Sequence, residues 1–260
     1  MNDINQIQAS KARLQDLYRY NRFIYFESKK QNSIGKSYST PFFIDPEKFQ
    51  HNDPWEYKIN SYGFRGDEWT FEKTPAFFGC SCTFGVGVKA PASDIVCDEL
   101  GVKSIPNLGS PGVSLANIVK LFAAFVNLHA VSEAFIIIPP ITRVLLPTYS
   151  DKDAWQMINY LPNYIYKDDN KFHKKVFQVL NDNVAKSYAV DYIDWANLIA
   201  KDKGIKVHWG TWEKDTYEFL KLAVNNPFYW DNPLTDRARD GNHPGQKTHR
   251  ILAEKCISLL

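Results

Sequence analysis

Short apolar runs alternate with longer segments of helical periodicity over most of the chain. The runs Ala76–Phe78, Val102–Leu108, Ala134–Ile138 and Ile205–Trp209 have the length and composition of buried strands. Between them, apolar residues return every three or four positions, most clearly over Ser114–Ala130, which is typical of helices that pack on a sheet. Strands that alternate with helices form parallel β-α-β units. The pattern therefore predicts an α/β fold, with a parallel sheet at the centre of a three-layer α/β/α sandwich.

Helical periodicity continues in the segments that flank these strands. Five further helices are predicted, over residues 93–100, 171–187, 191–203, 217–222 and 245–259. Ser93 has the side chain of a helix N-cap. Gly101 and Gly204 are natural helix ends, because glycine readily adopts the left-handed conformation that follows a last helical turn. These helices would supply the outer layers of the sandwich.

Two regions do not follow this alternation. From Phe26 to Trp69 the composition changes to Pro, Asn, Ser, Tyr and Gly without a clear period. Long irregular stretches of this kind are functional or lie along the surface. Residues 144–168 contain two prolines and five aromatic residues, which predict an inserted, partly helical flap above the sheet. Its aromatic side chains either line an acyl or sugar pocket or pack in the core.

The pattern divides the chain into an N-terminal extension, residues 1–70, and a main α/β domain, residues 71–260. Within the extension, residues 4–22 place apolar side chains at helical spacing with Lys and Arg between them. This amphipathic helix has two open interpretations: it packs on the main domain, or it contacts another copy of the chain. A second full domain is not expected, because 260 residues suit one sizeable core.

Composition limits the classes of partner and compartment. The net charge of +2 and the lack of a basic run give no reason to expect nucleic acid as a partner. No segment approaches the roughly 18 consecutive apolar residues of a membrane span, so no membrane is expected. The first residues do not have the pattern of a signal peptide, so a cytoplasmic location is the default expectation, although a virion-borne protein would share these features. The four cysteines predict free buried thiols rather than a disulfide framework.

Candidate chemistry begins where the first apolar strand ends. The run Ala76–Phe78 leads into Gly79-Cys80-Ser81, a turn of small residues, then into polar and glycine residues, and then into a helix. This places the Ser81 hydroxyl at the carboxyl end of a strand, where open α/β sheets bind their ligands. A serine acts as a nucleophile only with a base, and Asp240-Gly-Asn-His243 supplies a histidine with a carboxylate three residues before it.

Other interpretations of these residues are weaker. The glycines after Ser81 lack the third glycine of a dinucleotide-binding motif, and Lys89 is followed by Ala90 where a Walker A loop has Ser or Thr. Asp240 and His243 provide only two metal ligands, and no cluster of Cys and His in the sequence supplies the others. We therefore expect neither a metal nor a cofactor.

Three blocks along the chain resemble those of the SGNH (GDSL-type) hydrolases, and they occur in that family's order. They are Gly79–Gly85, Asn107–Ser114 and Asp240-x-x-His243, and together they span most of the chain. The resemblance implies a flavodoxin-like sheet with strand order 2-1-3-4-5. It also implies a catalytic triad of Ser81, His243 and Asp240.

The resemblance also implies an oxyanion hole with three hydrogen-bond donors, and the sequence of this chain contains two of them. These are the backbone N–H groups of Ser81 and Gly112; the third donor is an Asn side chain from a block that follows the third strand. At that position this chain reads Pro139-Pro-Ile-Thr142-Arg143, without Asn. Either Arg143 or Thr142 substitutes for it, or the protein is a slow or inactive relative.

A segment before the nucleophile strand, Asn60-Ser-Tyr-Gly63-Phe-Arg65-Gly66, resembles one found in many SGNH proteins. Two interpretations are open. Asn60 and Arg65 belong to the rim of the active site and bind substrate, or the segment is a turn that depends on Gly63 and Gly66.

These observations predict a serine esterase, or acyl-ester hydrolase, that works through an acyl-enzyme. Its substrate would be a small-molecule or carbohydrate ester, with O-deacetylation of carbohydrate as the finer hypothesis. One alternative is an O-acyltransferase with the same intermediate. The other is a non-catalytic binding or structural protein on the same scaffold, for example in a virion, because a fold does not dictate a function. The sequence does not predict an oligomeric state.

Overall fold

The computed structural model describes residues 37–39, 56–60, 62–70, 72–150, 154–160, 182–230, 236–238 and 243–260. The helix predicted at residues 4–22, most of the helix predicted at 171–187, and Asp240 lie outside these residues.

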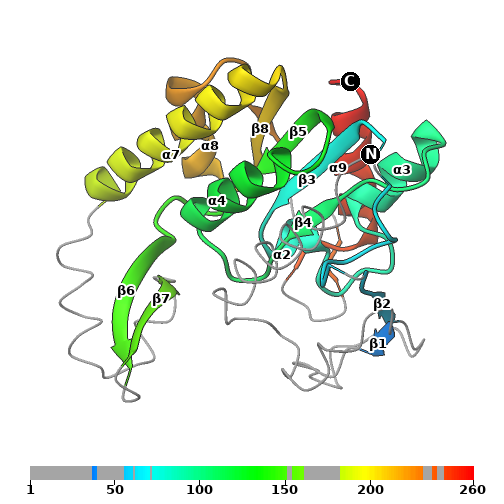
Figure 1. Ribbon diagram of the computed structural model, residues 1–260, viewed down its shortest axis with the longest axis horizontal. Coiled ribbons are helices and arrows are strands. Elements are labelled where there is room, and N and C mark those ends of the chain that lie inside the picture. The colour runs from blue at the N-terminus through cyan, green and yellow to red at the C-terminus, as the bar shows by residue number, and fades with distance from the viewer. Residues whose placement is uncertain are drawn as a thin grey trace.

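A five-stranded parallel sheet forms the centre of the molecule (Figure 1). Its strands are β3 (Thr74–Gly79), β4 (Asn107–Gly109), β5 (Val131–Ile137), β8 (Lys206–Thr211) and β9 (Phe228–Tyr229). They stand side by side in the order β4-β3-β5-β8-β9. Numbered along the chain within this sheet, that order is 2-1-3-4-5, as the resemblance implied.

Helices cover both faces of this sheet. They are α2 (Ser81–Phe84), α3 (Ala92–Leu100), α4 (Leu115–Val126), α7 (Asp182–Lys203), α8 (Lys214–Ala223) and α9 (Gln246–Ile257). Helix α4 packs on α7, whereas α3 packs on α9, and the two pairs lie on opposite sides of the sheet (Figure 1). The predicted three-layer α/β/α sandwich is therefore confirmed.

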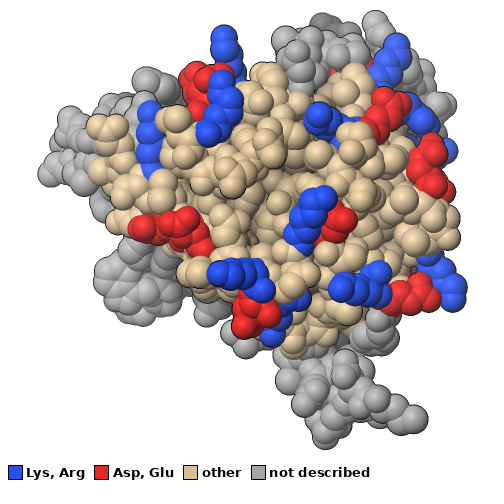
Figure 2. All heavy atoms as spheres, turned by 90° about the horizontal axis from the view of Figure 1, so that it is seen from above, with Lys and Arg blue, Asp and Glu red and all other residues tan. Residues whose placement is uncertain are grey.

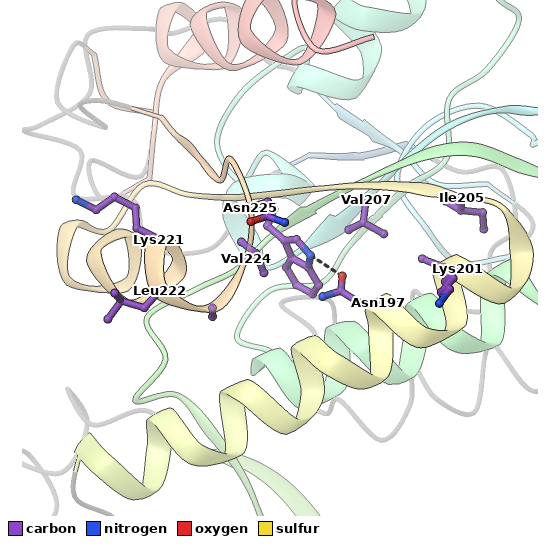
Figure 3. A pocket seen from close by; sticks show the side chains of 11 residues that line it. Asn197, Lys201, Ile205, Val207, Lys221, Leu222, Val224 and Asn225 are labelled. Carbon is purple, nitrogen blue, oxygen red and sulfur yellow. Dashed lines mark hydrogen bonds between the residues drawn. The ribbon is translucent and has the colours of Figure 1, made fainter.

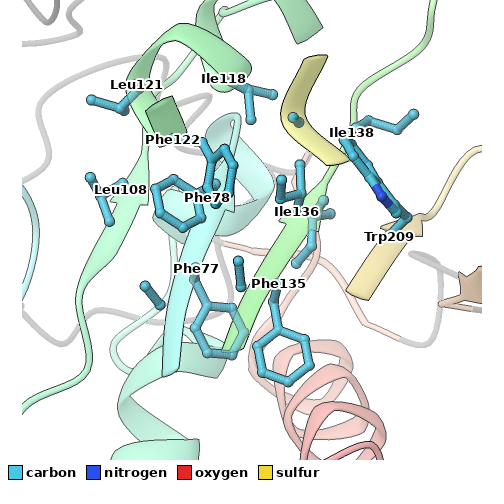
Figure 4. Close-up of a cluster of buried hydrophobic side chains, with 14 of the residues drawn as sticks. Phe77, Phe78, Leu108, Ile118, Leu121, Phe122, Phe135, Ile136, Ile138 and Trp209 are labelled. Carbon is cyan, nitrogen blue, oxygen red and sulfur yellow. The ribbon is translucent and has the colours of Figure 1, made fainter. Parts of the chain in front are cut away.

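Strand β3 is buried on both of its faces, which explains its unbroken apolar sequence (Figure 4). Phe77 stacks on Phe135 of the neighbouring strand, with ring centroids 4.9 Å apart. The next residue, Phe78, faces the other layer and meets the ring of Phe122 edge-on at 5.2 Å. Because successive side chains of a strand alternate in direction, two adjacent phenylalanines join the sheet to both helical layers.

The segment predicted as a partly helical flap contains strands instead. Residues Val144–Ser150 (β6) and Ala154–Tyr160 (β7) form an antiparallel hairpin, so the helical part of the prediction is wrong for these residues. The two sequences are rich in Val, Ile, Thr, Tyr and Trp, and such residues favour extended backbone. The remainder of the predicted flap, from residue 161 to 168, lies outside the described residues.

Several local predictions also need correction. Helix α7 runs without the predicted break between residues 187 and 191, because no Gly or Pro interrupts it. Pro91, not Ser93, is the N-cap of α3. The predicted strand Val102–Leu108 is regular only at its end, in β4. Residues Asn225–Asn242, rich in Asn, Pro and Asp, predict a loop, but a short strand, β9, lies within them and pairs with the end of β8.

The region predicted to be irregular includes one small piece of sheet. Strands β1 (Ser37–Ser39) and β2 (Glu56–Lys58) pair antiparallel. Elsewhere in this region, Ile59 and Arg65 form an isolated antiparallel bridge.

Acidic and basic side chains are interspersed on the face of the molecule shown in Figure 2, and no single-sign patch dominates it. None of the helices within the described residues combines the length and the apolar composition that crossing a membrane requires.

Replacing Phe78 by Ala tests the importance of the doubly buried strand. Phe78 has no exposed surface, so the substitution leaves a cavity between β3 and α4. We expect the free energy of unfolding, measured with urea, to fall by about 3–5 kcal/mol. The control Leu222→Ala removes a side chain that is 90% exposed and should change stability by less than about 0.5 kcal/mol. Equal effects of the two substitutions would contradict this description of the core.

Candidate active site

Ser81 lies where the sequence predicted, immediately beyond the carboxyl end of the central strand β3. Strand β3 ends at Gly79, Cys80 is extended, and Ser81 is the first residue of helix α2. A Cβ atom on Gly79 would lie 2.8 Å from the carbonyl oxygen of Ile137, so this tight turn requires glycine. The Ser81 side chain is largely buried, with 8% of the residue's surface exposed.

The second predicted block lies beside the first. Gly109, the last residue of β4, is paired in register with Gly79, and the N–H of Ser110 donates to the carbonyl of Gly79 at 2.9 Å. Gly112 follows in a turn with a left-handed backbone, at φ 77°. The structure therefore brings Gly112 to the same end of the sheet as Ser81.

The side chain of Asn107 connects this block to helices α2 and α3. Its Nδ2 donates to the carbonyl of Thr83 at 3.0 Å and to Oγ of Ser93 at 2.9 Å. Its Oδ1 accepts the N–H of Gly109 at 2.9 Å. Asn107 is completely buried, and these bonds hold the nucleophile helix against the strand ends. Sequence reasoning included Asn107 in the second block but gave it no role.

Arg143, the predicted substitute for the missing Asn, lies close to both blocks. Its Nη1 donates to the carbonyl of Val113 at 3.4 Å. Its positive charge acts on the thiols of Cys80 and Cys82, which flank Ser81. Within the described residues, no carboxylate forms an ion pair with Arg143. The sequence leaves open an alternative role for Arg143, that of a surface arginine paired with a carboxylate such as Asp151 or Asp153, and both of these residues lie outside the described ones.

The two cysteines beside Ser81 form an unusual feature of the site. Sγ of Cys80 lies 3.7 Å from Oγ of Ser81. Burial disfavours a thiolate at Cys80, but the neighbouring Cys82 thiol and the charge of Arg143 outweigh this effect and lower the pKa of Cys80. Interaction with Cys80, together with burial, raises the pKa of Cys82. The sequence predicted buried thiols, but their contact with the Ser81 hydroxyl emerged only from the structure.

His243 lies in a short paired loop just before helix α9. The N–H of Ala238 donates to the carbonyl of His243 at 2.8 Å, and the N–H of Gly245 donates to the carbonyl of Asp236 at 3.1 Å. This pairing fixes the backbone on both sides of the residues that include Asp240. Because Asp240 itself lies outside the described residues, its role as the partner of His243 stays a prediction.

Helix α9 begins three residues after His243 and packs beside the segment that follows the nucleophile helix α2. The helix packs on α3, and Nδ1 of the fully buried His249 accepts the N–H of Ala92 at 3.2 Å. Burial and the nearby charge of Arg65 lower the pKa of His249 to about 3. His249 is therefore neutral at physiological pH, which keeps Nδ1 available as an acceptor.

Asn60 and Arg65 have internal hydrogen bonds in the structure. Oδ1 of Asn60 accepts the N–H groups of Tyr62 and Phe64, both at 3.0 Å, which makes a turn. Arg65 is 3% exposed and donates to four backbone carbonyls, those of Phe84, Gly85, Val88 and Lys89. These contacts match the interpretation of the segment as a structural turn. Substrate binding by either residue stays a prediction.

His208, which lies on the central strand β8, forms its side-chain contacts away from Ser81. Nε2 of His208 hydrogen-bonds to Glu133, and its ring stacks on Phe135 at 4.8 Å. Glu133 is in the amino-terminal half of β5, so this pair points away from the strand ends that carry Ser81. In the described part of the chain, no group of three His, Cys, Asp or Glu side chains is placed to hold a metal ion.

A separate hollow of about 450 Å³ lies between α7, β8 and α8 (Figure 3). Its wall includes Trp209, whose indole N–H donates to Oδ1 of Asn197 at 3.0 Å. Lys201 and Lys221 also line it. None of the predicted site residues does, so this hollow is not part of the candidate active site.

Comparison with known proteins finds similarity only to solved structures, at low sequence identity. No family model matches the chain, and no curated protein does. Solved structures that resemble it include a member of the lipolytic protein G-D-S-L family from Veillonella parvula DSM 2008, with 12% identity, a TM-score of 0.43, and coverage of 73% of this chain and 98% of that one. Another is the Clostridium thermocellum family 3 carbohydrate esterase, with 13% identity, a TM-score of 0.41, and coverage of 72% and 94%. Because these TM-scores are below 0.5, the similarities carry no conclusion about function.

The buried His249 predicts a loss of stability in acid. Its pKa is about 6.5 in an unfolded chain and about 3 in the folded protein. Between these two pH values the imidazole is protonated in the unfolded state but not in the folded state. Stability from this residue is therefore complete above pH 6.5 and declines as the pH falls towards 3. His249→Asn keeps an acceptor for Ala92 but does not titrate. Urea unfolding between about pH 7 and pH 4 should show a shallower decline for this variant, by about 1–3 kcal/mol in total; equal declines would contradict the assignment.

Proposed function

We propose that the protein is a serine ester hydrolase in which Ser81 is the nucleophile, His243 is the base and Asp240 orients His243. The observation that carries the proposal is the position of Ser81 at the end of β3, with the Gly112 turn just after the neighbouring strand β4. The docking of α9 on α3 gives further support, because it holds the segment before α9 at this side of the molecule. Ligands bind at the carboxyl ends of the strands in open α/β sheets.

In the proposed reaction, Oγ of Ser81 attacks the carbonyl carbon of the ester while His243 takes the hydroxyl proton. The resulting tetrahedral intermediate carries a negative oxygen, which the N–H groups of Ser81 and Gly112 would stabilise. The intermediate then collapses, and His243 returns the proton to the departing alcohol. Water, activated by His243, attacks the acyl-enzyme and releases the acid, which restores Ser81.

Arg143 would complete the oxyanion hole in place of the missing Asn. A buried or half-buried cation stabilises a developing negative oxygen more strongly than a neutral amide does. The bond of Arg143 to the Val113 carbonyl and its effect on the two cysteines beside Ser81 support this role. Anchoring of an anionic part of the substrate is the other role that this position would allow.

The finer substrate proposal is an O-acetyl group carried by a carbohydrate. It rests on the resemblance of the three sequence blocks to the SGNH family. Transfer of the acyl group to another alcohol, rather than to water, would use the same acyl-enzyme, so an O-acyltransferase is the neighbouring possibility.

Ser81→Ala and His243→Ala should each reduce the turnover of p-nitrophenyl acetate by several orders of magnitude, because triad residues act as a unit. Asp240→Asn should be somewhat less damaging. A fluorophosphonate probe should label the wild type at Ser81 in mass spectrometry of its peptides. The control Ser258→Ala changes an exposed serine at the end of α9 and should leave turnover unchanged. Undiminished activity in Ser81→Ala would refute the assignment.

A second test separates the two roles of Arg143. If the guanidinium stabilises the oxyanion, Arg143→Ala should lower kcat by about 10²–10³ with little change in KM, even for an uncharged acetate ester. If it anchors substrate, KM should rise for acidic esters alone. Unchanged kinetics on both kinds of ester would exclude both roles.

A further inference from the structure

Helix α9 is joined to the segment after the nucleophile by a pair of hydrogen bonds from one side chain. Oε1 of Gln246 accepts the N–H of Ala90 at 3.0 Å, and its Nε2 donates to the carbonyl of Ala90 at 2.7 Å. A primary amide that binds both the N–H and the carbonyl of one residue has a fixed position and orientation. Gln246 is the first residue of α9 and comes three positions after His243.

Gln246 is not needed to complete the start of its own helix. The carboxylate of Asp236 accepts the N–H of Lys247 at 2.8 Å, the N–H of Thr248 at 2.9 Å and the Thr248 hydroxyl at 2.7 Å. These bonds satisfy two N–H groups of the first turn that have no partner within the helix. Among the described residues, the side chain of Gln246 hydrogen-bonds to Ala90 and not to the first turn of its own helix.

Ala90 belongs to a segment that is also held from its other side. The four carbonyls that Arg65 binds belong to Phe84, the last residue of α2, and to Gly85, Val88 and Lys89, and the next bond, from Ala92 to His249, leads into α3. A set of fixed contacts thus runs from the nucleophile helix through this segment to Gln246, which follows His243 by three positions in the chain. Within the described residues, the Gln246–Ala90 pair is the contact of this set that lies closest to His243 in the sequence.

We propose that Gln246 is a positioning residue, which fixes the location of His243 relative to Ser81. The inference rests on the proposed function. Proton transfer between a nucleophile and its base requires a separation of about 2.6–3.2 Å, and a displacement of about 1 Å can reduce the rate by about 10²-fold. Gln246 is exposed, so removal of its side chain opens no cavity and should cost little stability. A lower kcat with an unchanged melting temperature in Gln246→Ala is therefore the result that a positioning role predicts.

The test compares Gln246→Ala with Lys247→Ala, which shortens the next exposed side chain of the same helical turn. For p-nitrophenyl acetate, Gln246→Ala should lower kcat by about 10–100-fold with KM changed less than about twofold. The melting temperature should stay within about 2 °C of the wild type. Lys247→Ala should match the wild type in all three quantities.

An NMR measurement on protein with ¹⁵N-labelled histidine gives a readout that does not require activity. The side-chain resonances of His243 should move in Gln246→Ala but not in Lys247→Ala, while those of His208, on β8, should stay in place in both. If kcat or the His243 resonances in Gln246→Ala are unchanged, or if the His208 resonances move as well, the positioning role is wrong. If the wild type shows no hydrolysis that depends on Ser81, the proposed function fails, and the resonances alone decide whether Gln246 positions His243.

Discussion

The candidate site depends on how closely helix α2 approaches the ends of strands β3 and β4. A Cβ atom on Gly109 would lie 2.6 Å from Cα of Phe84, and one on Gly79 would lie 2.8 Å from Cβ of Thr83, both in α2. Neither position can hold a side chain unless the backbone moves. Because both strand ends are glycine, α2 rests directly on the sheet, Ser81 follows the strand without a long loop, and Ser110 can bond to Gly79.

Buried polar side chains then fix the irregular chain around that contact. Arg65 is almost completely buried, and burial lowers its pKa to about 10. Four backbone carbonyls and the face of the Tyr57 ring, 4.7 Å from the guanidinium carbon, offset the loss of water around its charge. The buried side chain of Asn107 likewise has all its hydrogen bonds to neighbouring groups, and these bonds connect β4 with α2 and α3. Such side chains replace the regular backbone hydrogen bonds that a loop lacks, and they position the residues on either side of α2.

Burial keeps two of the histidines, His129 and His249, uncharged. It lowers the pKa of His129 to about 4, and burial with the charge of Arg65 lowers that of His249 to about 3, so both are neutral at physiological pH. His249 uses this neutrality to accept a backbone N–H, which secures α9 against the segment that follows α2. The same helix begins beside His243. The structural histidine His249 thus secures the helix that begins three residues after His243, the proposed catalytic histidine.

His243 as the base stays a prediction, but the sequence by itself determined the alternation of strands and helices and the place of Ser81 after a buried strand. These features depend on local patterns, since apolar periodicity and small residues at a strand end act over a few positions. The hairpin of β6 and β7 and the short strand β9 were decided by pairing with other strands, which periodicity does not reveal. The contacts of Arg65, Asn107 and Gln246 were also decided by the tertiary structure. A side chain bonds to whichever backbone groups the fold brings near, and Gln246 meets Ala90 across 156 positions of sequence.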